Sequence, residues 1–210
     1  MNNRIHKLRS TLAVATACLL LSACASVVRN ALPEELHQDA TVLGQSDLRR
    51  WGDGQRQAAF AGIETREELD ARYGGIMNQP HNYLVISGGG ANGAYGAGVL
   101  NAWTAQGTRP EFTIVTGVST GALIAPFAFL GSDYDVQLKQ LYTTLDTTQI
   151  LNTRSWFSLF GADSFVDTSP LSRKLEEVVD QDMVDALARE YAKGRTLVVG
   201  TTNLDAGRPV

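Results

Sequence analysis

The sequence predicts an α/β fold, in which the strands of a mainly parallel sheet alternate with helices. Residues 83–86 form a short apolar run, and residues 113–118 form a second run with the continuous apolar pattern of buried parallel strands. Glycines follow each run. After the first run they lead into a helix that ends at Gly107, and after the second they lead into a small apolar helix at residues 122–130. This alternation through short loops is typical of parallel sheets with right-handed crossovers.

The C-terminal part of the chain continues the same alternation. Helices are expected at residues 171–180 and 182–193, and Gly194 is placed to end the second of them. A third strand is expected at residues 195–201. These helices are expected to cover the sheet from outside.

The region upstream of the first strand has a different composition. Residues 24–80 are polar and broken by glycines, with short helical patterns only at 45–51 and 64–73. We therefore divide the chain into a leader at residues 1–23, a spacer at 24–80 and a folded domain at 81–210.

The leader has the composition of an export signal. A basic segment precedes an apolar run at residues 12–21, which is too short to span a bilayer comfortably. The run ends in Leu21-Ser22-Ala23-Cys24, which resembles the lipobox of bacterial lipoproteins. This resemblance implies a lipid anchor on Cys24, and Ala25 in place of the aspartate of inner-membrane retention signals implies the outer membrane. An ordinary signal with a cysteine near its cleavage site is the alternative.

Charge and cysteine content restrict the class of protein further. The chain has a formal net charge of −4, and loss of a leader with three basic and no acidic residues makes it −7, which argues against a nucleic-acid-binding surface. The only cysteines, Cys18 and Cys24, lie at the N-terminus, so the domain has no internal disulfide. No metal-ligand cluster or cofactor motif is present, and we predict neither a metal nor a cofactor.

A glycine-rich loop follows the first predicted strand. Its spacing, Gly88-x-Gly90-x-x-Gly93, also satisfies the dinucleotide-binding pattern. That pattern requires an acidic residue at the end of the second strand, where this chain has Thr116-Gly117-Val118-Ser119. A phosphate-binding P-loop is excluded because no Gly-Lys-Ser/Thr follows the glycines.

A serine stands where the second strand turns into the next helix. The sequence Gly117-Val118-Ser119-Thr120-Gly121 fits the nucleophile elbow, in which the flanking glycines avoid collisions with the neighbouring strand and helix. The alternative is that Ser119 is an ordinary N-cap in a glycine-rich turn. Parallel strands present their carboxyl ends at one edge, so this turn and the glycine loop are expected to be neighbours.

A serine nucleophile needs a base, and histidine is the usual one. The chain contains only His6, His37 and His81, and none of them follows the first strand. His81 precedes that strand and is expected at the opposite edge of the sheet. A carboxylate is therefore the better candidate for the base.

Together these motifs resemble those of the patatin-like phospholipases, serine acyl hydrolases that use a Ser-Asp dyad. The resemblance covers residues 82 to 210 and implies a three-layer α/β/α fold with a mainly parallel sheet. It makes Ser119 the nucleophile, with Gly117 and Gly121 as the elbow glycines. The implied oxyanion hole consists of Gly88, Gly89, Gly90, Ala91, Asn92 and Gly93. Asn92 departs from the family, where a basic residue is common.

The dyad aspartate has no clear counterpart in this sequence. The family carries it in an Asp-Gly-Gly or Asp-Gly-Ala motif downstream of the elbow, and neither occurs here. Asp205 is the substitute that follows a strand, but Asp-Ala-Gly is typical of a turn. We expect that the domain is incomplete at its C-terminus and that the aspartate lies beyond residue 210.

The sequence therefore predicts a membrane-anchored serine hydrolase that acts on lipid or phospholipid acyl esters. An acyltransferase with the same nucleophile and a non-catalytic envelope scaffold are the alternatives. The aromatic segment at residues 155–170 is expected either to pack in the core or to form an apolar loop over the site.

Overall fold

The computed structural model describes residues 32–37, 40–42, 44–45, 48–53, 65–144, 152–153, 166–167 and 169–210. The predicted leader, Cys24 and most of the aromatic segment lie outside these ranges. The chain divides into two compact units, and the unit of residues 32–152 and 168–210 contains most of the predicted domain, all but residues 153–167. The described residues of the other unit are Thr153, Val166 and Asp167. Thr153 belongs to the short strand β3 (Asn152–Thr153), and the other two form the short strand β4 (Val166–Asp167).

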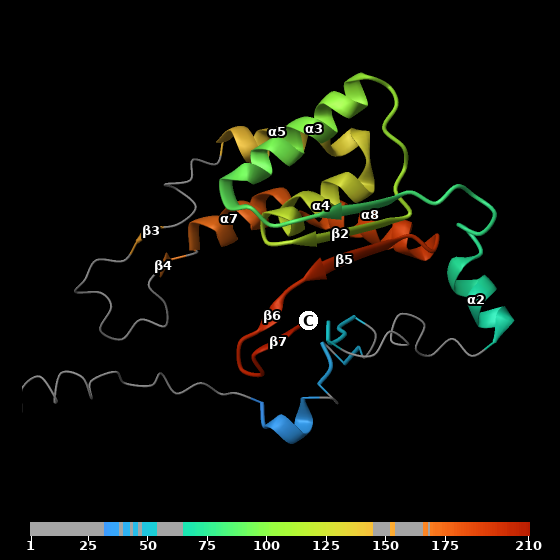
Figure 1. Cartoon of the computed structure of the whole chain (residues 1–210), viewed down its shortest axis with the longest axis vertical. Helices are drawn as coiled ribbons and strands as arrows, with labels where there is room; N and C mark the ends of the chain where they lie inside the picture. The colour runs from blue at the N-terminus through green and yellow to red at the C-terminus, as the bar shows by residue number, and fades with distance from the viewer. Residues whose placement is uncertain are drawn as a thin grey trace, which may run out of the picture. The chain divides into compact units, whose positions relative to one another are not determined.

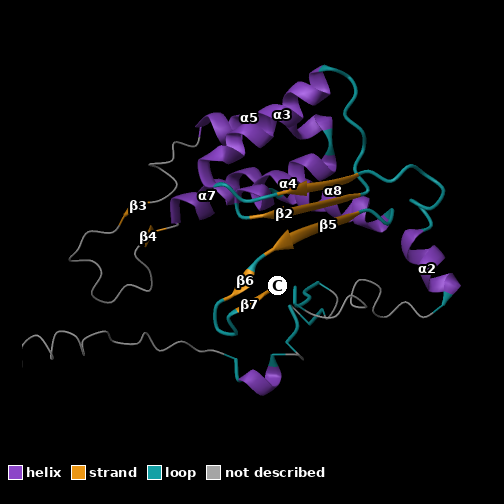
Figure 2. Ribbon diagram, viewed as in Figure 1, coloured by secondary structure: helices purple, strands orange, loops and turns teal. Residues whose placement is uncertain are grey.

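A three-stranded parallel sheet forms the centre of the larger unit. Its strands β1 (Tyr83–Ile86), β2 (Ile114–Val118) and β5 (Thr196–Gly200) are paired in the order β1-β2-β5. All pairs are parallel, so the three carboxyl ends meet at one edge (Figure 2). The structure thus confirms the α/β class and the three predicted strands.

Helices pack against one face of this sheet. Figure 1 shows α3 (Gly93–Ala105), α4 (Thr120–Leu130) and α5 (Asp135–Thr144) on the same side of the strands. Helix α8 (Gln181–Ala192) contacts both α4 and β5. Helix α7 spans Ser169–Val178, and α2 spans Arg66–Tyr73. The described residues also form the short 3₁₀ turns η1 (Glu34–Leu36), η3 (Gly90–Asn92) and η4 (Ser132–Tyr134).

The hydrophobic core lies between the sheet and these helices. Helix α4 is apolar on nearly all sides, as expected for a helix surrounded by protein, and it packs against β2. The fully buried side chains with the largest volumes are Val115, Ile124, Phe127, Phe129, Leu138, Leu141 and Met183. Burial of each contributes about 1.5–3 kcal/mol, so the core stabilises the domain without a disulfide.

The opposite face of the sheet remains apolar and exposed. Its side chains include Val85 from β1, Val118 from β2 and Val198 from β5, which are 77%, 54% and 46% exposed. Of the three layers that the family resemblance implies, the described residues show the sheet and the helices on one face. In the part of the chain that the structure describes, no helix is both long enough and apolar enough to cross a membrane.

Most predicted boundaries agree with the structure to within two residues, but one predicted helix is wrong. Residues 48–51 are not helical, and Val42 and Gln45 form an isolated antiparallel bridge. A helix of that length needs tertiary packing, which this polar segment does not provide. The hairpin of β6 (Thr202–Asn203) and β7 (Arg208–Pro209) was not expected from the sequence.

A buried ion pair connects the loop before β2 to the start of α5. Arg109 Nη1 lies 2.6 Å from Asp135 Oδ1, and both side chains are at most one-tenth exposed. Arg109 also donates to Thr104 Oγ1 and to the Ala128 carbonyl oxygen. The second carboxylate oxygen of Asp135 is buried without a hydrogen-bond partner in the described part of the chain. Loss of either partner therefore leaves a buried charge without its counter-ion.

Replacement of Asp135 by alanine is expected to lower the free energy of unfolding by about 3 kcal/mol, because Arg109 keeps its charge in a buried site. Urea unfolding measures this difference. Asp133→Ala is the matched control, because Asp133 is exposed two residues earlier and its loss is expected to change stability by less than about 0.5 kcal/mol. Equal stabilities for the two variants would show that the ion pair contributes nothing.

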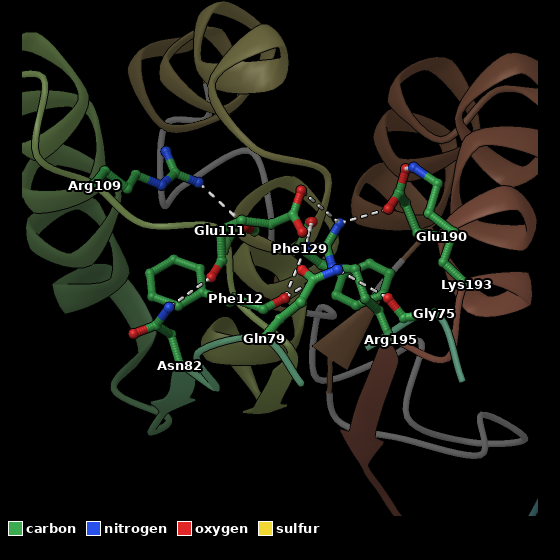
Figure 3. Close-up of polar contacts among 11 residues, drawn as sticks. Gly75, Gln79, Asn82, Arg109, Glu111, Phe112, Phe129, Glu190, Lys193 and Arg195 are labelled. Carbon is green, nitrogen blue, oxygen red and sulfur yellow. Dashed lines mark hydrogen bonds and ion pairs between the residues drawn. The ribbon is translucent and has the colours of Figure 1, made fainter. Parts of the chain in front are cut away.

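A buried arginine joins three elements at the amino edge of the sheet, as Figure 3 shows. Arg195 is 3% exposed and precedes β5. Its guanidinium group donates to the carbonyl oxygens of Phe112 and Phe129 and forms an ion pair with Glu190 at 2.7 Å. Burial opposes ionisation of Glu190, but hydrogen bonds from Lys193 and Arg195 outweigh it and lower the pKa of this carboxyl.

Candidate active site

Ser119 lies between the last residue of β2 and the first residue of α4, at the carboxyl edge of the sheet. Its backbone has φ 55° and ψ −124°, a conformation that L-residues rarely adopt. Among the described non-glycine residues, only Asn78 shares a positive φ. Such strain persists where the surrounding structure imposes it, and it is common at functional sites.

The hydroxyl group of Ser119 does not cap the helix that follows. The start of α4 has no side-chain capping bond, and the turn is closed instead by the Ala122 N–H, which donates to the Ser119 carbonyl oxygen at 2.9 Å. The Ser119 residue is exposed, and its Oγ makes no hydrogen bond within the described part of the chain. Ser119 thus stands at the N-cap position without capping the helix through its side chain, and the hydroxyl is available for another partner.

The two flanking glycines are required by close backbone contacts. A Cβ atom on Gly117 would collide with the carbonyl oxygen of Gly121. A Cβ atom on Gly121 would collide with the Ile86 carbonyl oxygen and lie 2.8 Å from that of Ser87. The end of β1 thus packs directly against the start of α4, which holds the Ser119 turn in its strained shape.

The glycine loop lies beside this turn, as the sequence predicts. A Cβ atom on Gly88 would lie 3.0 Å from Ser119 Cβ and 3.6 Å from its Oγ. The loop continues through Gly89 into η3 and then into α3, which begins at Gly93. Among the described residues, no acceptor binds the N–H groups of Gly88 and Gly89. Backbone donors of this kind, next to a serine hydroxyl, are the elements of an oxyanion hole.

The remaining loop residues have different environments. Gly90 has φ +55°, and Ala91 and Asn92 are exposed on η3. Asn92 precedes α3 without a side-chain capping bond. Gly93 is buried against Thr120 and Tyr142.

Tyr142 is a residue of this region that sequence reasoning missed. It lies on α5, and its hydroxyl group contacts Thr120, the residue after Ser119. Around Tyr142 the sequence shows only the spacing of an amphipathic helix, so no local signal could have identified Tyr142 as a residue of the site. The contact depends on how α5 packs against α3 and α4.

Asp205 occupies a turn, as the sequence Asp-Ala-Gly indicates. It lies between β6 and β7, where Asn203 Oδ1 accepts hydrogen bonds from the N–H groups of Asp205 and Ala206, each at 3.0 Å. A cavity of about 430 Å³ beside it is lined by residues of this turn and of the η1 region. No described residue places a carboxylate or imidazole in hydrogen-bond contact with Ser119.

The described histidines also lie away from Ser119. His81 precedes β1 and stacks on Tyr83, and His37 contacts the Leu32 carbonyl oxygen. Within the described ranges, no group of three or more His, Cys, Asp or Glu residues is arranged to hold a metal ion.

The described residues define an α/β protein whose parallel sheet carries a strained serine turn and a glycine loop at its carboxyl edge. The family model described as patatin-like phospholipase matches residues 84–209, more than half of the chain. The chain therefore belongs to the patatin-like phospholipase family, a family of lipid acyl hydrolases. Comparison with curated proteins gave no match, and comparison with solved structures gave none.

Proposed function

We propose that this protein is a serine acyl hydrolase of the lipase or phospholipase A type, which cleaves lipid acyl esters through an acyl-enzyme. One observation carries the proposal: Ser119 has a strained backbone, and its exposed residue does not cap α4 and lies directly beside the glycine loop. Membership of a family of lipid acyl hydrolases supports the choice of a lipid acyl ester as substrate.

In the proposed mechanism, Ser119 Oγ attacks the ester carbonyl carbon while its proton passes to a carboxylate base. The N–H groups of Gly88 and Gly89, together with that of Thr120 at the start of α4, donate to the oxyanion. Collapse of this intermediate breaks the ester bond, and the base returns the proton to the departing alcohol. Water then gives a proton to the base and attacks the acyl-enzyme. The bond between the acyl group and Ser119 Oγ breaks, the base passes its proton to Ser119 Oγ, and the fatty acid is released.

The base that we propose is an aspartate, which completes a Ser-Asp dyad. The described histidines lie elsewhere, and the geometry of Asp205 is that of a turn residue. The exposed Asn92 brings no charge to the glycine loop, which favours a general acyl ester over a requirement for a phosphate group.

The test is labelling of the full-length protein with a fluorophosphonate, which reacts with activated serines. We expect one adduct, located on the peptide that contains Ser119, and its loss in Ser119→Ala. Ser132→Ala is the matched control, because Ser132 is exposed at the far end of α4 and is expected to label like the wild type. A folded wild-type protein that does not label would refute the hydrolase and favour the scaffold alternative.

We also propose that the protein is anchored by lipid on Cys24 and lies in the outer membrane. Mass spectrometry of the mature protein is expected to find an N-terminal acylated Cys24, and detergent phase partition is expected to place the protein with the detergent. Each buried methylene contributes about 0.8 kcal/mol, so Cys24→Ser should release the protein to the aqueous phase. Cys18→Ser is the matched control and should remain with the detergent. An unmodified Cys24 would contradict this anchor.

A further inference from the structure

Tyr142 reaches from α5 to the first residue of α4. Its hydroxyl oxygen lies 2.6 Å from Thr120 Oγ1, and the hydroxyl donates to the Thr120 carbonyl oxygen at 3.1 Å. Because the phenol has a single proton, the Thr120 hydroxyl is the donor in the shorter contact. The Tyr142 hydroxyl group thus contacts both the side chain and the backbone of Thr120.

The phenol remains a hydrogen-bond donor over a wide pH range. Burial raises the pKa of Tyr142, and the hydrogen bond with the Thr120 side chain opposes this only in part. Protonated Tyr142 therefore holds the Thr120 carbonyl oxygen at neutral and mildly alkaline pH.

The same pair of hydroxyl groups supports the glycine loop. Gly93, the first residue of α3, packs on it so closely that a Cβ atom there would collide with Thr120 Oγ1 and lie 2.8 Å from the Tyr142 hydroxyl oxygen. The other end of the loop, Gly88, contacts Ser119. Three segments therefore meet at one point: the serine turn, the glycine loop and α5.

We infer that Tyr142 and the Thr120 hydroxyl form a positioning pair that holds the Ser119 turn and the glycine loop in catalytic register. This inference rests on the proposed hydrolase function. Tyr142 has no contact with Ser119 Oγ among the described interactions, so it is a positioning residue and not a catalytic one.

The effect on catalysis follows from the position of Thr120. The residue after the nucleophile supplies an oxyanion donor through its backbone N–H. Rotation of Thr120 moves this donor, the adjoining Ser119 and the surface on which Gly93 rests. Displacements of about 1 Å at a reacting centre cost up to roughly 10²-fold in rate, whereas binding of the acyl chain is hardly changed.

The experiment measures kcat and KM of the full-length protein with a short-chain p-nitrophenyl ester, and the rate of fluorophosphonate labelling. Tyr142→Phe and Thr120→Val are each expected to lower kcat and the labelling rate about tenfold, with KM within about twofold of the wild type. The double variant is expected to be no slower than Tyr142→Phe, because loss of the phenol hydroxyl already removes both contacts with Thr120. Thr120→Ser, which retains the hydroxyl group, is expected to lose less of kcat than Thr120→Val.

Tyr134→Phe is the matched control, since Tyr134 packs on the same core from η4 without contact to Thr120. Melting temperatures of all variants separate folding from positioning. Wild-type kcat in Tyr142→Phe, or a loss that is explained by unfolding, would overturn the inference and leave the proposed function intact. If wild-type Ser119 does not label at all, the proposed function fails and the inference fails with it.

Discussion

Replacement of Ser119 by alanine is expected to lower kcat/KM for ester hydrolysis by at least about 10⁴-fold, because the alanine variant has no group that forms the acyl-enzyme. The fold is expected to survive, since Ser119 Oγ makes no hydrogen bond within the described part of the chain. The measurement is steady-state hydrolysis of a p-nitrophenyl ester by the full-length protein. Ser132→Ala is the control for loss of a serine hydroxyl, and equal rates for Ser119→Ala and the wild type would exclude Ser119 as nucleophile.

A glycine at position 119 separates strain from chemistry. Ser119 has φ 55°, which glycine adopts without the steric cost that a Cβ atom incurs. Ser119→Gly is therefore expected to be inactive but more stable than Ser119→Ala by about 1 kcal/mol, as judged by urea unfolding. A glycine variant that is less stable than the alanine variant would contradict the strained turn.

Replacement of Arg195 by methionine is expected to lower the free energy of unfolding by about 4 kcal/mol. The methionine keeps the aliphatic volume but leaves the carbonyl oxygens of Phe112 and Phe129 without this donor. Each buried group without a partner costs about 1–3 kcal/mol, and Glu190 also loses a counter-ion. Because these groups belong to three elements of the domain, the whole domain should lose stability.

Two further variants make this result specific. Arg195→Lys keeps the charge but not the planar fork of donors, and it is expected to lose about half as much stability. Arg189→Met is the matched control, because Arg189 is exposed on α8 and its loss is expected to cost less than about 0.5 kcal/mol. An Arg195→Met variant as stable as Arg189→Met would show that the buried hydrogen bonds contribute nothing to stability.

Local signals in the sequence were sufficient for the elements that make the site. The apolar runs of β1 and β2 predict buried strands, and the structure has them at Tyr83–Ile86 and Ile114–Val118. The glycines at 117 and 121 predict a tight turn, and each is required by a backbone contact. The segment at 45–51 shows the opposite case, because a short polar helical pattern has no packing partner to stabilise it.

Contacts between distant residues were not predictable in this way. Tyr142 is 22 residues from Thr120, and Arg195 is 83 residues from Phe112, so neither pairing has a local sequence signal. The pairing of β5 with β2 likewise depends on packing across the sheet.

The sequence by itself determined the α/β class, the three strands of the central sheet, the two glycine motifs and the place of Ser119 in the chain. These depend on side-chain pattern and on glycine, which act on the backbone within a few residues. Only the tertiary structure decided that the Ser119 hydroxyl leaves the helix uncapped, that Gly88 lies against it and that Tyr142 holds the next residue. The physical reason is that each of these depends on the position of another element, which packing of the whole domain sets.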